Sequence, residues 1–276
     1  MISGSGYEVL FDQKSDPQAD LRHRYVSRYR TRTVDAGPMR YIEIYRMLNA
    51  WEGAGRARQK ARESRAAQKA LNERNARKKI EWLFNENFDS GDTFATLTFA
   101  EPVEEGGARD AVRKLIRRAR AYVRRDTSRK DAVLKYIYVI EGKVGTDEIE
   151  RYHIHMVISG ISRDALESLW EHGRANTRKL QPDKNQFTGL AKYMTKQRRF
   201  RRRWSCSKNL RRPRETVADH KISRRKVERL AAEARYAAAE IFEKANAGFR
   251  LVEEPEIKLS DYVPGAYIYA RMRRKE

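Results

Sequence analysis

The sequence is poor in the residues that several common architectures require. Its one cysteine, Cys206, can form neither an internal disulfide nor a cysteine-rich zinc site, and this usage fits a reducing compartment. No run of about 18 apolar residues could cross a membrane. Residues 1–11 are too polar, and carry too little positive charge at their start, for a secretory signal. We therefore expect a cytoplasmic protein.

The sequence also lacks the motif of a nucleotide-driven motor. Residues 141–145, Glu-Gly-Lys-Val-Gly, do not match the Gly-x4-Gly-Lys-[Ser/Thr] pattern of a P-loop, so we expect no helicase engine. Acidic residues are scarce as well: 38 Asp and Glu stand against 60 Lys and Arg, a formal net charge of +22. Such a charge attracts polyanions of any sequence, and nucleic acid is the expected partner.

Two histidines stand in a segment rich in Ile and Val, residues 152–159. The segment is typical of a strand, in which alternate residues share a face, so His153 and His155 point the same way. Two parallel imidazoles on a rigid strand form half of a metal site. The simpler interpretation is a pair of histidines on a half-exposed strand face.

A tyrosine and a lysine follow in a segment without Gly or Pro, residues 190–199, whose apolar positions recur at helical spacing. Tyr193 and Lys196 then lie at i and i+3 on one helix face. A tyrosine beside a metal-polarised phosphate can act as a nucleophile, and a lysine one turn away can neutralise phosphate charge. The simpler interpretation is a core tyrosine beside a solvated lysine.

Together, and in this order, these segments resemble the HUH endonuclease superfamily, specifically the rolling-circle replication initiators (Rep proteins) of bacterial plasmids and phages. Residues 93–99, Thr-Phe-Ala-Thr-Leu-Thr-Phe, are similar to the first motif of that family. Residues 153–155 match its histidine-hydrophobe-histidine motif, and residues 193–196 match its Tyr-x-x-Lys motif. Residues 203–210 resemble a segment that follows the tyrosine helix. The resemblance covers about residues 90–210.

The resemblance implies a reaction and a set of partners. Tyr193 would attack a DNA phosphate, remain attached to the 5′ end of the nicked strand and later allow rejoining, while Lys196 would stabilise phosphate charge or the tyrosyl oxygen. His153 and His155 would bind a divalent metal, Mg²⁺ or Mn²⁺. The DNA would be a single-stranded or hairpin origin, and a host helicase and polymerase would take part in the cytoplasm of a bacterium.

A third, anionic metal ligand is expected, because two neutral imidazoles alone hold a divalent ion weakly. Glu141 is the best candidate, since it ends the strand before the histidine strand and hairpin pairing can bring it alongside His153 and His155. Glu148 and Glu150 are alternatives nearer in sequence.

The pattern of residues 93–199 predicts the order β-α-β-β-α-β-α. Strands are expected at 94–99, 135–141, 152–159 and 175–180, and helices at 109–125, after the capping residue Ser162, and around Tyr193. This order predicts an α+β fold with a ferredoxin-like split βαβ core and an antiparallel sheet. The resemblance to HUH nucleases implies the same core.

Basic segments flank the predicted nuclease. Residues 197–214 carry the strongest run of positive charge, interleaved with aromatic rings, and are expected to bind the DNA backbone. The candidate DNA-binding residues are Arg198, Arg199, Arg201, Arg202, Arg203, Trp204 and Lys208. Residues 22–32 interleave tyrosine and arginine, which fits either nucleic-acid contacts or a solvated face.

The flanking segments are expected to be mainly helical. Helical spacing is present at 41–51 and 223–245, and residues 56–90 contain no Gly or Pro. The expected division is a basic helical extension at 1–90, the HUH endonuclease domain at 91–214, and a helix and tail at 215–276 that pack on the nuclease core. Alternatives to the initiator are an HUH relaxase, a single-tyrosine transposase and a non-catalytic basic nucleic-acid-binding protein.

Overall fold

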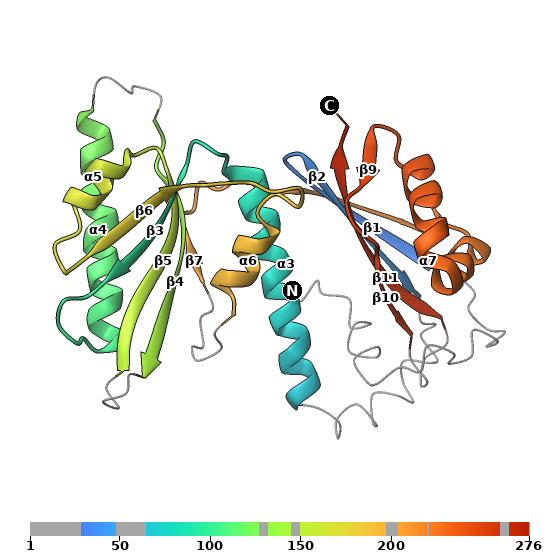
Figure 1. Cartoon of the computed structure of the whole chain (residues 1–276), viewed down its shortest axis with the longest axis horizontal. Helices are drawn as coiled ribbons and strands as arrows, with labels where there is room; N and C mark the ends of the chain where they lie inside the picture. Colours follow the sequence, from blue (N-terminus) through green and yellow to red (C-terminus); the bar gives the residue numbers. More distant parts are fainter. Residues whose placement is uncertain are drawn as a thin grey trace. The chain divides into compact units, whose positions relative to one another are not determined.

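The computed structural model describes residues 29–47, 65–126, 132–144, 150–196, 204–219, 221–259 and 265–275. The chain is a mixed α+β protein with two antiparallel sheets (Figure 1). It forms two compact units, one from residues 83–212 and the other from 1–82 together with 213–276. None of the helices in these ranges is long and apolar enough to cross a membrane.

The unit of residues 83–212 contains a five-stranded sheet in the order β6-β3-β5-β4-β7. Its elements follow the predicted order and are β3 (Thr93–Thr98), α4 (Glu105–Arg125), β4 (Lys135–Val144), β5 (Glu150–Ser159), α5 (Arg163–Ser168), β6 (Ala175–Lys179), α6 (Thr188–Met194) and β7 (Ser205–Cys206). All of its strand pairs are antiparallel, and β4 and β5 form the predicted hairpin. Ser162 caps α5 as expected, since its hydroxyl accepts a hydrogen bond from Ala165 N.

Helices α4 and α5 cover one face of this sheet, and α6 lies on the other (Figure 1). The apolar side of α4, including Val112, Leu115 and Ile116, packs on the alternate β5 residues Ile154 and Met156. The period of 3.6 residues in the helix and of two in the strand lets both elements bury a continuous apolar surface. The remaining β5 positions, which include both histidines, therefore face away from α4.

The second unit contains a sheet in the order β10-β11-β2-β1-β8, with β9 pairing to β11. Its strands are β1 (Tyr29–Ala36), β2 (Met39–Arg46), β8 (Arg214–Asp219), β9 (Phe249–Leu251), β10 (Glu256–Leu259) and β11 (Ala266–Arg274), and its helix α7 spans Arg224–Ala245. One core joins apolar residues of α7 to this sheet. A second core on the sheet contains Tyr41, Tyr269 and Trp82 of α3 (Arg65–Asn87).

Three predictions for the flanking segments are wrong over the residues that the structure describes. The 41–51 helix is instead part of β2, whose residues are almost all buried. The charges of the 56–90 helix were assigned to solvent, but Lys78 and Glu81 of α3 are buried and pair with Glu43 and Arg271. Helix α7 packs within its own unit rather than on the predicted nuclease core, and it is kinked at Glu233.

Candidate active site on the sheet face opposite α4

Strand register brings the three predicted metal ligands together on one sheet face. Glu141 of β4 stands directly opposite His153 of β5, and His155 stands opposite Val139 of β4 and Thr96 of β3. Opposite residues of an antiparallel pair point to the same side, so Glu141 and His153 share a face with His155. This is the face turned away from α4 and α5.

His155 is the best-ordered polar group of this face. Its side chain is buried, with Nε2 2.8 Å from Glu141 Oε2 and Nδ1 3.3 Å from Thr96 Oγ1. An ionised carboxylate only accepts hydrogen bonds, so a neutral His155 donates from Nε2 to Glu141 and accepts the Thr96 hydroxyl at Nδ1. The imidazole also stacks on Phe94, with ring centroids 6.0 Å apart. Both strands next to β5 therefore fix the orientation of this ring.

The donor set fits a divalent ion in type: two imidazoles and one carboxylate on a single face are ligands that Mn²⁺ accepts. Only His155 and Glu141 are in direct contact, and His153 is partly exposed. Among the residues in the described ranges, no three His, Cys, Asp or Glu side chains gather closely enough to hold a metal. Glu148 and the side chain of Glu150 lie outside those ranges.

Tyr193 of α6 lies beside the histidine. Its ring centroid is 5.1 Å from that of His155 and 6.2 Å from that of Phe94, in edge-on geometry in both cases. The side chain is 50% exposed, so a ligand can reach its hydroxyl. The predicted tyrosine and the predicted histidine, 38 positions apart in sequence, are thus in contact.

Helix α6 is shorter than the sequence predicts. It ends at Met194, where Thr195 leaves the helical conformation and its hydroxyl donates to Ala191 O at 2.7 Å. Lys196 lies beyond the helix, although its backbone N–H still donates to Tyr193 O at 3.2 Å. The prediction that Tyr193 and Lys196 share a helix face is therefore wrong, because the turn tightens between them.

The start of α6 is anchored to α3. Asn85 is buried, and its side-chain oxygen accepts the Phe187 N–H at 3.1 Å immediately before the helix begins. The preceding residue, Gln186, adopts a φ of 54°, a left-handed conformation that costs a non-glycine residue on the order of 1 kcal/mol. These contacts fix where α6 enters, and hence where Tyr193 stands on the sheet.

A pocket of about 300 Å³ opens next to Tyr193 and is lined by β6, the loop that follows it and α6. Arg178 of β6 lines it, with its guanidinium carbon 5.0 Å from the centroid of the Phe94 ring. Sequence reasoning missed Arg178, Phe94 and Thr96 as site residues. Their alternation on β3 and β6 is visible in the sequence, but the pairing of these strands with the histidine strand is not.

The predicted DNA-binding residues are only partly described. Arg198, Arg199, Arg201, Arg202 and Arg203 lie outside the described ranges. Trp204, just before β7, is partly exposed, and Lys208 is exposed on the turn that follows β7.

Comparison with known families finds one match for this part of the chain. Residues 92–198 match the model of a family described as replication-associated protein ORF2. The matched segment contains β3 through α6 and every residue of the candidate active site. No curated protein and no solved structure shows a significant match to the chain.

Proposed function

We propose that this protein is a rolling-circle replication initiator that nicks one DNA strand at an origin through Tyr193. The observation that carries the proposal is the contact of Tyr193 with the His155–Glu141 pair, within a segment similar to replication-associated proteins. A structural tyrosine would have no need of a half-exposed position beside a buried, doubly bonded histidine.

The topology supports a ferredoxin-like nuclease core. The four longer strands lie in the sheet in the order β6-β3-β5-β4, and α4 and α5 lie on one face. Counted along the chain, this order is fourth, first, third and second, which is the arrangement of a split βαβ unit. The open face then carries the site, and both neighbours of the histidine strand contribute side chains to it.

The chemistry of the proposal is a transesterification. The Tyr193 oxygen forms a bond to the scissile phosphorus and the bond from phosphorus to the 3′ oxygen breaks. The phenol loses one proton and the departing 3′ oxygen gains one, so the step is balanced without water. The 5′-phosphotyrosine retains the energy of the phosphodiester, and attack by a 3′ hydroxyl rejoins the strand.

His153, His155 and Glu141 would hold a divalent metal, Mg²⁺ or Mn²⁺. Such an ion would supply charge withdrawal from the non-bridging phosphate oxygens. The protein's own contribution is orientation: Thr96 and Phe94 fix the His155 ring, and Arg178 places a cation beside the pocket that Tyr193 lines. Lys196, one residue beyond the C-cap of α6, would neutralise phosphate charge near Tyr193.

A nicking assay tests the proposal. With labelled single strands from candidate origins and Mn²⁺, the wild type should cleave one strand at a defined position, whereas His153→Ala and His155→Ala should not cleave although they still bind the DNA. His172→Ala is the matched control, because His172 packs against Phe99 and Trp170 away from this face. Binding without cleavage by the wild type would make the chain a non-catalytic nucleic-acid-binding protein, and undiminished cleavage by the double histidine variant in chelator would remove the metal site.

A further inference from the structure

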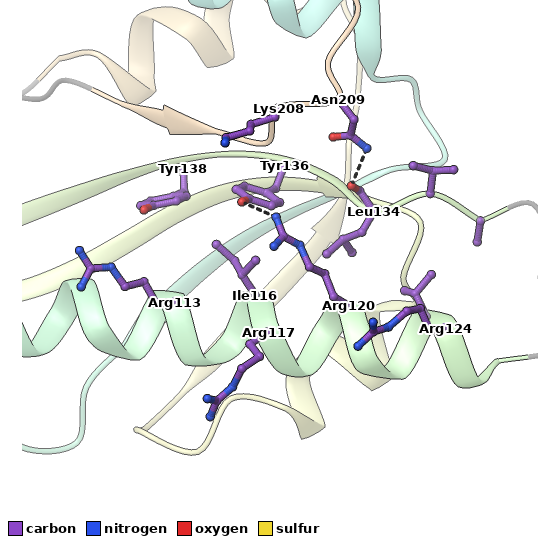
Figure 2. Close-up of a pocket in the computed structure, with 13 residues that line it drawn as sticks. Arg113, Ile116, Arg117, Arg120, Arg124, Leu134, Tyr136, Tyr138, Lys208 and Asn209 are labelled. Atoms are coloured by element: carbon purple, nitrogen blue, oxygen red, sulfur yellow. Dashed lines mark hydrogen bonds between the residues drawn. The ribbon is translucent and has the colours of Figure 1, made fainter.

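A second, larger cavity lies on the opposite face of the five-stranded sheet. It has a volume of about 810 Å³ and is bounded by α4, by β4 with the residues before it, and by the turn after β7 (Figure 2). The turn is held firmly to β4, because Asn209 Nδ2 donates to Leu134 O at 3.1 Å and Ser207 N donates to Tyr136 O at 2.9 Å. The cavity is therefore built from rigid elements.

The lining is strongly basic and contains no carboxylate. Four exposed arginines of α4 recur at intervals of four, three and four residues, which places them in one stripe along the helix. The cationic residues of the lining are Arg113, Arg117, Arg120, Arg124 and Lys208.

Most of these cations are available to an external anion. Figure 2 shows Arg113 and Arg120 extending from α4 toward the tyrosines of β4, whereas Arg117 extends away from them. No carboxylate pairs with Arg120 or Arg124 within the described ranges. Arg113 pairs with Asp110 at 2.8 Å, but both side chains are mostly exposed, and such pairs contribute little.

Two tyrosine rings lie beside this stripe. Tyr136 and Tyr138 stand at alternate positions of β4, with ring centroids 6.2 Å apart. Tyr136 is mostly buried and its hydroxyl accepts a hydrogen bond from Arg120 Nη2 at 3.2 Å, so the hydroxyl proton stays free to be donated. Burial raises the pKa of Tyr136, although the Arg120 charge lowers it, and the phenol remains a donor at neutral pH. Tyr138 is less buried and offers its ring.

We propose that this cavity binds a segment of single-stranded nucleic acid, with Arg113, Arg120 and Lys208 on phosphates and Tyr138 stacked on a base. A stripe of cations beside an aromatic ring is the combination that sequence-tolerant single-strand binding uses. A duplex would hide the faces of its bases from Tyr138. An acidic peptide would satisfy the arginines but give the ring no partner.

The inference rests on the proposed function only in taking DNA as the polyanion. The cavity lies on the face away from Tyr193, so it would grip a stretch of strand outside the cleavage position. Its test uses chelator, where no nicking occurs, so that loss of cleavage and loss of this site are separate outcomes.

The first experiment measures charge. Fluorescence anisotropy with fluorescein-labelled oligothymidylate in EDTA, over a salt series, should show weaker binding by Arg113→Gln/Arg120→Gln than by wild type. The log–log salt slope should fall by about 1.4, since each lost single-strand phosphate contact removes roughly 0.7. The matched control is Lys114→Gln/Arg118→Gln, with the same charge loss on another side of α4, and it should keep the wild-type slope. Equal slopes for the two double variants would overturn the proposal.

The second experiment measures stacking. Tyr138→Leu should weaken oligothymidylate binding by roughly five- to hundredfold, while Tyr138→Phe, which keeps the ring, should bind like wild type. Photo-crosslinking of 5-iododeoxyuridine-substituted oligonucleotide should label the peptide that contains Tyr138. Unchanged binding by Tyr138→Leu, or an equal loss of affinity for duplex DNA, would overturn the single-strand assignment. Full competition by thymidine monophosphate at the same concentration of nucleotide would instead assign the cavity to mononucleotides.

Discussion

At the scale of single residues, the contact between Glu141 and His155 determines what the candidate site can do. A carboxylate beside an imidazole can orient that ring, or both can bind one metal ion. The register that places Glu141 opposite His153 favours the second role, because the three groups then converge from adjacent strands.

Glu141→Gln should weaken Mn²⁺ binding at least about tenfold, which corresponds to about 1.4 kcal/mol, because the amide keeps the size but loses the charge. Isothermal titration with MnCl₂ measures the change. Glu171→Gln, whose carboxylate pairs with Arg118 at 2.6 Å, is the control and should bind like wild type. An unchanged affinity for Glu141→Gln would move the third ligand to Glu148 or Glu150.

Glu43 makes the stability of its unit depend on pH. Burial raises the pKa of its carboxyl, but Lys78 at 2.8 Å and Arg32 at 3.0 Å outweigh this and hold the pKa below the ordinary value of 4.5. A lowered pKa gives stability that is complete above about 4.5 and is lost as the pH falls through the folded value. Urea unfolding between pH 7 and pH 3 should therefore show a falling free energy of unfolding below about pH 4.5.

Glu43→Gln should cost about 3–5 kcal/mol at pH 7, because it leaves buried Lys78 without its charge partner, and should reduce the dependence on acid. Glu215→Gln removes an exposed partner of Arg32 and should cost about 1 kcal/mol or less. A Glu43→Gln protein as stable as the Glu215→Gln control would show that the buried pair contributes no net stability.

At the scale of elements, two asparagines of α3 hold two different segments. Asn85 accepts the Phe187 N–H before α6, whereas Asn87 accepts the Arg211 N–H at 2.7 Å and donates to Arg211 O at 2.9 Å. Each is buried and fixes one connection.

Asn85→Ala should leave the Phe187 N–H without a protein partner, at a cost of about 1–3 kcal/mol, and should loosen the entry of α6. Amide hydrogen exchange should accelerate at Phe187 and along α6. Asn87→Ala should instead accelerate exchange at Arg211 and leave α6 protected. Acceleration of α6 by both variants alike would mean that α3 as a whole, not Asn85, positions the helix.

The elements of the candidate site were largely predictable, because their patterns are local. The histidine strand and the α4 helix each bury one face, so alternation and helical spacing identify them. β2 was mistaken for a helix because it is buried on nearly every residue, which removes the alternation that marks a strand. The end of α6 was missed because it depends on the single hydroxyl of Thr195.

Long-range placement was not readable from the sequence. Arg178 and Thr96 join the site only through strand pairing, which a single chain does not reveal. The arginine stripe of α4 looked like a solvated helix face, and only the position of β4 and Lys208 shows it to be one wall of a cavity.

At the scale of the whole molecule, the net charge of +22 predicts DNA binding that weakens steeply with salt. If residues 198–214 grip the phosphates, charge reversal of Arg201, Arg202 and Arg203 should weaken binding and flatten the log–log slope by roughly 0.7 to 0.9 for each lost contact. Anisotropy over a salt series measures both. An unchanged affinity and slope would place the main backbone contacts elsewhere.

The covalent intermediate tests the central claim most directly. Denaturing electrophoresis of wild-type protein with Mn²⁺ and single-stranded origin DNA should show a protein–DNA adduct that carries the label of the fragment 3′ of the nick. Tyr193→Phe removes only the hydroxyl, so it should erase the adduct while fold and DNA affinity are unchanged. An adduct of undiminished yield in Tyr193→Phe would mean that another residue attacks, and cleavage by the wild type without any adduct would mean that water is the nucleophile; either result would contradict the account.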